Sequence, residues 1–134
     1  MEKVFQEESN IGGKRVFINL TNHPSSAWGT EQEREAKNYG EIIDIPFPSI
    51  PVDINDTELN ALVDKYYVHI KKQPYPVVML QGEFVFVYRL VNRLKEVGIR
   101  VFSACTERIV SEDTKPDGSV VKTSRFQYRG LREY

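Results

Sequence analysis

The sequence predicts an α/β domain, with a parallel sheet flanked by helices and a β-hairpin near its carboxyl end. Short apolar runs alternate with amphipathic segments along the first three quarters of the chain, and a polar turn then divides the last quarter. The chain has 134 residues, of which 40% are hydrophobic and 28% charged, so it is long enough to bury a core of ordinary size.

The apolar runs are the expected strands, because each is short and rich in β-branched or aromatic residues. They occupy residues 16–20, 41–45, 76–80 and 100–105. The third run, PVVML, is apolar throughout, as is typical of a strand that is buried on both faces.

The segments between these runs are the expected helices. Thr30 and Glu33 match a capping box, which predicts a helix that runs to Tyr39 and is followed by Gly40. A third helix is expected from residue 84 to Gly98. The second has an apolar face with spacings of three and four: Leu59, Leu62, Val63, Tyr66, Tyr67 and Ile70.

Residues 109–128 predict the hairpin, with its turn at residues 116–118. Residues 1–14 are expected to form a loose N-terminal arm, and residues 15–134 a single domain that includes the hairpin. Strands that alternate with helices favour right-handed crossovers, which put helices on both faces of the sheet. The expected fold is therefore a small Rossmann-like α/β domain.

The composition excludes several classes of function. A net charge of -1 gives no reason to expect a long nucleic acid as a partner. No apolar stretch is long enough to cross a bilayer, and the single cysteine, Cys105, allows no intramolecular disulfide. We therefore expect a cytoplasmic protein without a membrane partner. Two histidines and one cysteine do not approach the spacing of metal ligands, so neither a metal nor another cofactor is expected.

Polar residues follow three of the expected strands, where open parallel sheets bind their ligands. With a strand order of 2-1-3-4, the first two groups would lie side by side. The first group is Asn22, His23, Ser25 and Ser26, the second is Gln81, Gly82 and Glu83, and the third is Thr106, Glu107 and Arg108.

Each group has a functional and a structural interpretation. His23 suits an acid, a base or a donor to phosphate, whereas the neighbouring Asn and Ser side chains are also typical of turn caps. Glu83 could act as a general base or a nucleophile, but a helix N-terminus also favours an acidic residue. Gln81 directly follows four apolar strand residues, so its amide needs partners, which a ligand would supply. Gly82 allows a ligand to approach the backbone closely, and Glu107 and Arg108 could pair with residues of neighbouring loops.

The carboxyl-terminal segment carries a local cluster of cations with aromatic residues between them. Such a cluster suits contact with phosphates and stacking on bases, and it also suits an edge strand protected by its charges, which is the commoner case. The residues are Lys122, Arg125, Arg129 and Arg132, with Phe126, Tyr128 and Tyr134.

The segment NHPSS after the first strand and VVMLQGEF at the third resemble the small CRISPR-associated CARF-type proteins, including standalone ring nucleases, over roughly residues 14–108. The resemblance implies a homodimer that binds cyclic oligoadenylate across its two-fold axis. Some members cleave this ligand without a metal, by placing a ribose 2′-hydroxyl in line with the adjacent phosphate.

The resemblance also implies roles for the candidate residues. Asn22, His23, Ser25 and Ser26 would contact phosphate and ribose, and residues 81–83 would line the adenine or ribose side. Arg108 or Arg125 would stabilise the developing charge, with Thr106 and Glu107 among the ligand contacts. The candidate catalytic residues are therefore His23 and Arg108 for a ring nuclease, which would tolerate loss of Glu83, and Glu83 for the glycosyl-transfer alternative below. Glu83 and Glu107 depart from the pattern, because they bring negative charge to a site for phosphates.

Two other functions remain open from the sequence. A protein similar to nucleoside deoxyribosyltransferases would use Glu83 as nucleophile at a sugar carbon, with Asn22 or Gln81 holding the sugar. A domain without catalytic activity would bind a nucleotide or a protein partner at the same place.

Overall fold

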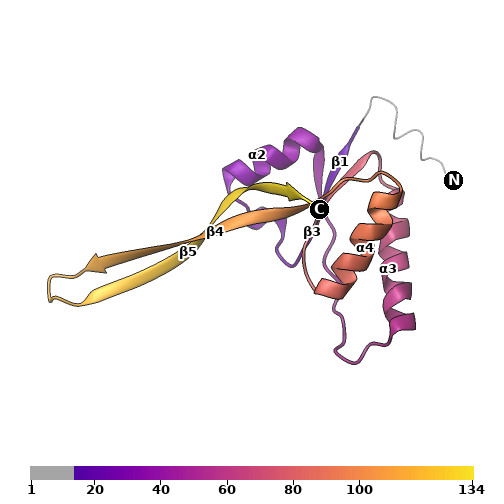
Figure 1. The fold of residues 1–134 in the computed structure, drawn as a ribbon. Helices are drawn as coiled ribbons and strands as arrows, with labels where there is room; N and C mark the ends of the chain where they lie inside the picture. The colour runs from indigo at the N-terminus through magenta and orange to yellow at the C-terminus, as the bar shows by residue number, and fades with distance from the viewer. Residues whose placement is uncertain (1–13) are drawn as a thin grey trace.

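The computed structural model describes residues 14–134, which form a five-stranded sheet with helices on both faces (Figure 1). The strand order is β2-β1-β3-β4-β5, with parallel pairs from β2 to β4 and an antiparallel pair between β4 and β5. The predicted α/β class is confirmed, but the sheet is mixed and not wholly parallel, because the last strand of the hairpin joins it. The strands are β1 (Val16–Leu20), β2 (Glu41–Asp44), β3 (Pro76–Leu80), β4 (Val101–Thr114) and β5 (Val120–Glu133). The predicted N-terminal arm, residues 1–14, lies outside the described residues except for Lys14.

Helices α3 (Asp56–Lys71) and α4 (Phe84–Glu96) cover one face of the sheet, and α2 (Thr30–Tyr39) covers the other (Figure 1). The side chains of β1 alternate between these faces: Ile18 lies in the cluster under α3 and α4, and Phe17 lies in the cluster under α2. The larger core is thus on the α3–α4 face, and burial on both faces explains why β1 and β3 are apolar runs.

Helix α3 confirms the periodicity of the sequence. Leu59, Val63 and Ile70 are buried, while the neighbouring Leu62, Tyr66 and Tyr67 pack partly buried against the same cluster. Its N-terminus is closed by a capping box, in which Asn55 accepts from the backbone of Glu58 at 2.8 Å and the Glu58 side chain accepts from the backbone of Asn55 at 3.2 Å.

The capping box predicted at Thr30 and Glu33 is wrong. Gly29 is the N-cap of α2, Thr30 is its first helical residue, and no side chain caps this end. The helix begins one residue earlier than the pattern suggests, because the Glu33 amide bonds to the carbonyl of Gly29 at 3.1 Å. The other end is as predicted, since α2 stops at Tyr39 and Gly40 follows.

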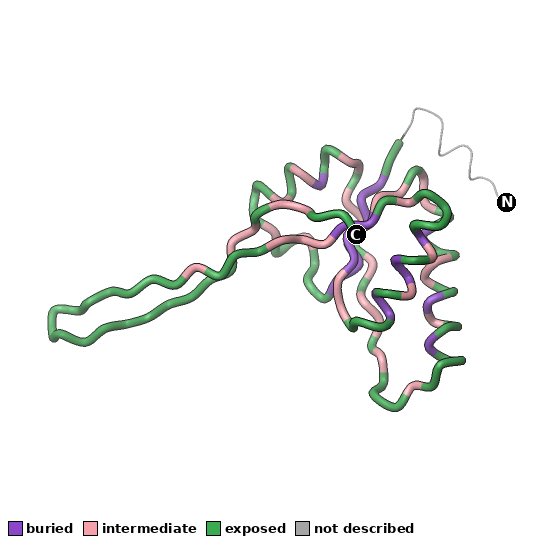
Figure 2. The backbone as a smooth tube through the Cα atoms, viewed as in Figure 1, coloured by how far each residue is buried: buried purple, intermediate pink, exposed green. Residues whose placement is uncertain are grey.

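The fourth strand does not end at Cys105, and this corrects the prediction. β4 continues to Thr114 and pairs with β5 over its whole length, so the hairpin extends well beyond residues 109–128 on both strands. A bulge between Cys105 and Thr106 bends the ladder where it leaves the body of the sheet. Beyond it the ribbon projects into solvent and is exposed along nearly its whole length (Figure 2). The turn lies where it was expected, at residues 115–119.

No helix in the described part of the chain is both long and apolar enough to span a membrane.

Candidate functional site

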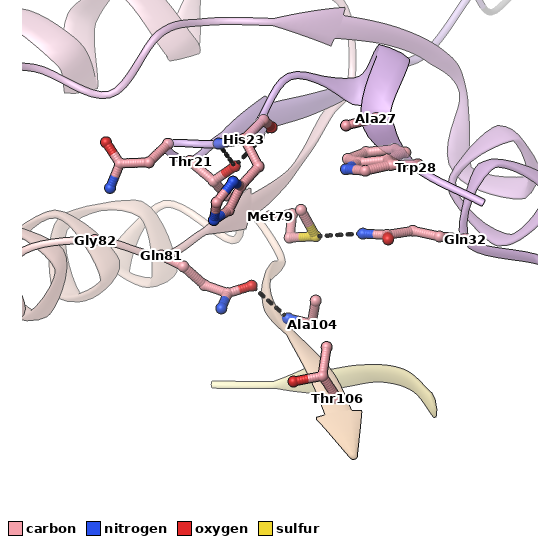
Figure 3. Close-up of a pocket in the computed structure, with 11 residues that line it drawn as sticks. Thr21, His23, Ala27, Trp28, Gln32, Met79, Gln81, Gly82, Ala104 and Thr106 are labelled. Atoms are coloured by element: carbon pink, nitrogen blue, oxygen red, sulfur yellow. Dashed lines mark hydrogen bonds between the residues drawn. The ribbon is translucent and has the colours of Figure 1, made fainter. Parts of the chain in front are cut away.

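A pocket of about 380 Å³ opens at the carboxyl ends of β1 and β3, on the α2 face of the sheet (Figure 3). Since β2 lies on one side of β1 and β3 on the other, this is where the strand order reverses, the usual place for a ligand in such sheets. We call it the switch-point pocket. Its lining residues are Thr21, Asn22, His23, Ala27, Trp28, Gln32, Met79, Gln81, Gly82, Ala104 and Thr106.

The loop after β1 is held by a buried network centred on Asn19. The Asn19 side chain is 1% exposed; its Nδ2 donates to the carbonyl of His23 at 2.8 Å and to Oδ1 of Asp44 at 3.0 Å. Its Oδ1 accepts from Oγ1 of Thr21 at 2.9 Å, and that hydroxyl oxygen accepts from the backbone amide of His23 at 3.1 Å. The network therefore fixes the backbone of His23 while leaving its ring exposed at the pocket.

Ser25 and Ser26 do not line the switch-point pocket. The Ser25 hydroxyl donates to Oδ2 of Asp44 at 3.0 Å, and its backbone amide donates to the same carboxylate. Ser25 and Ser26 also belong to a short 3-10 helix, η2 (Ser25–Ala27), that leads into Trp28. Of the first candidate group, only Asn22 and His23 lie at the pocket, and Ser25 helps to hold the loop.

Gln81 links β3 to β4 beyond the point where the ladder between these two strands ends. The ladder between β3 and β4 is paired only from Val78 to Met79, and beyond it Oε1 of Gln81 accepts from the backbone amide of Ala104 at 2.8 Å. The Gln81 oxygen thus has a partner within the protein. Its Nε2 group is the remaining donor, and the side chain lies at the pocket (Figure 3).

Gly82 and Glu83 have structural explanations. A Cβ atom on Gly82 would lie 2.2 Å from Cζ of Phe47, so an alanine there would have to displace the Phe47 ring. Glu83 is the N-cap of α4, and its Oε1 accepts from the backbone amide of Phe86 at 2.8 Å. Gly82 also lines the pocket, but Glu83 does not.

The third candidate group lies within a strand, and not in a loop after one. Of these residues only Thr106 lines the pocket, while Glu107 pairs with Arg129 of β5 at 2.7 Å. Arg108 and Arg125 lie farther along the projecting ribbon, outside the pocket lining. The structure therefore does not bring His23, Glu83 and Arg108 together in one chain.

Two of the carboxyl-terminal cations are paired across the ribbon. Lys122 lies 3.6 Å from Glu112, and Arg129 pairs with Glu107. The cluster that appears basic along the sequence is therefore partly neutralised by the opposite strand, which agrees with an edge strand protected by charges.

Three important pocket residues were not predicted. Trp28 is half-buried and meets Phe17 edge to face, with ring centroids 6.3 Å apart. Nε2 of Gln32 approaches Sδ of Met79 at 3.7 Å, a weak contact. Trp28 and His23 lie on either side of Met79 (Figure 3). The sequence feature that could have indicated this aromatic side of the pocket is the single tryptophan, which lies beside a predicted turn.

The switch-point pocket has an uncharged character. Of the residues that the structure describes, no lysine, arginine, aspartate or glutamate lines the pocket, and His23 is the one titratable side chain that does. Within residues 14–134, no group of three or more His, Cys, Asp or Glu side chains could hold a metal ion. An aromatic face with three side-chain amides, those of Asn22, Gln32 and Gln81, favours a flat, polar and uncharged group.

Tyr128 ties the base of the ribbon to α2, because its hydroxyl donates to Oε1 of Glu35. Burial raises the pKa of this hydroxyl well above its usual value, and the bond to Glu35 and its negative charge raise it further. The folded chain then holds the Tyr128 proton more tightly than the unfolded chain. Stability should therefore fall as the pH rises above about 10, the ordinary tyrosine pKa.

We expect Tyr128→Phe to lose less thermal stability than the parent protein between about pH 9 and about pH 11. Melting temperatures across this range would measure the difference. Tyr88→Phe is the matched control, because Tyr88 is 69% exposed and should behave like the parent. Identical pH profiles for both variants would show that the Tyr128 proton does not contribute.

The fold and the pocket define an α/β protein with an uncharged site at the reversal of its strand order. The chain belongs to the Uncharacterized protein MJ1673 family, whose profile matches residues 15–132. It is similar to the Uncharacterized protein MJ1673 of Methanocaldococcus jannaschii, with 26% identity over 86 residues. The aligned region covers 64% of this chain and 66% of that protein, just under two thirds of its length.

Proposed function

We propose that the protein binds a nucleotide-type ligand in the switch-point pocket, and that this ligand is a cyclic oligoadenylate. The observation that carries the proposal is the pairing of Trp28 with the amides of Gln32 and Gln81 in one uncharged pocket. An indole face offers stacking to any base, and amide groups supply both donors and acceptors for a base edge.

The free groups of the pocket agree with recognition of a base. Gln81 keeps its Nε2 donor, since its oxygen is taken by Ala104, and Gln32 makes only the weak contact to Met79. A volume of about 380 Å³ is at the lower end for ligand pockets, which suits one nucleoside unit of a larger ring. The other units would lie outside, as expected for a ligand shared by two copies of the chain.

His23 is the group best placed to act on the phosphate and ribose. Its ring is exposed beside Asn22 at the pocket, while its backbone is fixed by Asn19 and Thr21. A fixed backbone with an exposed imidazole suits a donor to phosphate, or proton transfer at the 2′-hydroxyl during ring opening without a metal. Cleavage is the second part of the proposal, and binding does not depend on it.

The CARF-like relationship is part of the same proposal. It includes a Rossmann-like fold, a cytoplasmic location and a role in CRISPR defence. The strand order β2-β1-β3-β4, with helices on both faces, supports the proposed fold type. Because no lysine or arginine of the described part of the chain lines the pocket, a cation for the phosphates would have to come from outside that lining.

Glycosyl transfer by Glu83 receives less support. A nucleophile must reach the sugar carbon, but the Glu83 carboxylate caps α4 and lies outside the pocket lining. Glu83→Gln should therefore leave ligand binding unchanged.

The experiment is a thermal-shift screen with adenosine, adenosine monophosphate and cyclic oligoadenylates, followed by chromatography of each mixture. A ligand that binds only the folded state raises the melting temperature. We expect a shift with a cyclic oligoadenylate, and about a tenfold weaker apparent affinity in Gln32→Leu, which removes one amide. His23→Ala should abolish any conversion to linear products.

His69→Ala is the matched control for His23→Ala, because His69 is exposed on α3, which covers the opposite face of the sheet. It should bind and convert the ligand as the parent does. If no nucleotide shifts the melting temperature, nucleotide binding is wrong. If a shift occurs without conversion, the protein binds the ligand and does not cleave it. Release of a free base that is lost in Glu83→Gln would favour glycosyl transfer instead.

A further inference from the structure

The projecting ribbon is joined to the rest of the described fold at its base, where Tyr128 bonds to Glu35, and its outer part extends into solvent. We call residues 106–128 the arm. Its two strands extend from the body with both faces in water (Figures 1 and 2). A two-stranded ribbon on its own is at best marginally stable in water, so an arm of this length indicates a missing contact.

The two faces of the arm differ. The register pairs Thr106 with Tyr128 and continues in steps of two to Thr114 and Val120, so all even-numbered side chains share one face. This even face carries the most exposed apolar groups of the arm: Phe126 is 72% exposed, and Val110 and Val120 are each 52% exposed. Tyr128 bonds to Glu35 and Thr106 lines the switch-point pocket, so the even face continues from the pocket side of the body.

The charges of the arm do not favour a nucleic acid. It carries four basic and four acidic side chains, a formal charge of zero, so no field attracts a phosphate backbone. Phenylalanine and arginine are enriched at protein–protein interfaces, and the arm exposes Phe126 and Arg108 on one face, which favours a protein as the partner.

The even face is complementary to the even face of a second copy whose strands run in the opposite direction. Along β4 it presents Arg108, Val110 and Glu112 in that order. If two arms stack face to face in opposite directions, Val110 meets Val110 of the other copy and Arg108 meets Glu112 of the other copy. Within one chain Arg108 and Glu112 are about 13 Å apart along the strand, too far to pair. Glu112 lies 3.6 Å from Lys122 of its own chain, so Arg108 of the other copy would join an existing ion pair.

We propose that two copies of this chain associate through the even faces of their arms, stacked in opposite directions about a two-fold axis at Val110. Each dimer then contains two Arg108–Glu112 pairs and covers the exposed Phe126 and valine side chains. The tip of each arm comes to the base of the other, beside the pocket at Thr106. In this dimer the two Thr106 residues, and with them the two pockets, lie roughly 26 Å apart along the strand direction, so each pocket would bind its ligand separately. A ligand shared by two copies would require a different contact between them, so the two proposals are tested independently.

The contact is modest in size. The arm is nine residues long on each strand, so its even face covers roughly 300 Å² per copy, less than the ~800 Å² per partner of a standard interface. We therefore expect an association that depends on protein concentration, with additional contact where the tip meets the other body.

The test is sedimentation velocity of the full chain over a range of concentrations. The parent should shift from monomer to dimer as the concentration rises. Arg108→Glu puts two acidic groups opposite each other twice in each dimer, and Glu112→Arg does the same with two basic groups. Each variant should weaken association by about tenfold or more, and the double variant should recover most of the loss.

Arg125→Glu is the matched control, because it makes the same change of charge on the odd face, opposite Ile109. It should dimerise like the parent, and melting temperatures of all variants check that they fold. A parent that stays monomeric, an Arg108→Glu variant that dimerises normally, or a double variant that is no better than the single ones would each overturn the proposal. So would binding of single-stranded RNA that is lost in Arg108→Glu while the dimer persists.

Discussion

Replacing Asn19 with leucine is expected to lower the free energy of unfolding by about 3 kcal/mol, although the two side chains are similar in size. The Asn19 amide is buried and bonds to the His23 carbonyl, Asp44 and Thr21. Leucine would remove these three bonds, and at about 1 kcal/mol for each bond their loss accounts for the expected change. Asp44 is exposed and keeps its bonds to Ser25, so the largest part of the cost falls on the buried Thr21 hydroxyl and the His23 carbonyl. Chemical denaturation followed by circular dichroism measures the change.

Two further variants make this prediction specific. Asn38→Leu is the control, because Asn38 is exposed on α2 and its replacement should change stability by less than about 0.5 kcal/mol. Thr21→Val removes only the hydroxyl that bridges Asn19 and the His23 amide, so it should lose about 1 kcal/mol. If Asn19→Leu were as stable as the parent, the loop after β1 would not depend on the buried network.

The role of Asn19 could not be predicted from the sequence. Asn19 stands within the run VFINL, which correctly predicts β1. Nothing in that run indicates that its polar member bonds to Asp44, which is 25 residues away. The crowding of polar residues after β1 therefore has a structural cause that depends on tertiary contacts, and the same contacts fix His23 at the pocket.

The elements that sequence predicted well are those with a local signal. The bounds of β3 are as predicted, since proline and apolar residues mark them, and the buried residues of α3 follow from its spacing. The extent of β4 has no local signal beyond Cys105. It continues because β5, which follows it in the chain, pairs with it across a bulge, and this placed Arg108 on the arm and away from the pocket.

The pocket itself was predicted only in part. The rule for open sheets located it, and Asn22, His23, Gln81, Gly82 and Thr106 do line it. The aromatic side of the pocket was not predicted, because it depends on the packing of α2. Trp28 and Gln32 face Met79 only because α2 packs across that face of the sheet. Ala36 is the one buried residue of α2, so a nearly polar helix gave little indication of the face it presents.

Gly40→Ala is expected to lower the free energy of unfolding by about 3 kcal/mol, for a steric reason. A Cβ atom there would lie 2.5 Å from the carbonyl oxygen of Arg15 and 2.8 Å from the amide nitrogen of Val16. These are backbone atoms at the start of β1, which cannot rotate away as a side chain could. The carbonyl of Arg15 also accepts from the amide of Glu41 at 2.9 Å, so relief of the clash would break the first bond between β1 and β2.

Two other glycines separate this steric effect from the conformational one. Gly98 has a φ of +80° but open space around its Cβ position, so alanine there should cost about 1 kcal/mol from the backbone alone. Gly29 has open space and an ordinary φ of -78°, so Gly29→Ala should change stability by less than about 0.5 kcal/mol. Denaturation of the three variants should therefore show the largest loss of stability for Gly40→Ala, a smaller loss for Gly98→Ala and the smallest for Gly29→Ala.

If Gly40→Ala lost no more stability than Gly98→Ala, the pairing between β1 and the edge strand β2 could open at little cost. The position of Asp44 at the other end of β2 would then be a weaker support for the His23 loop than the buried network indicates.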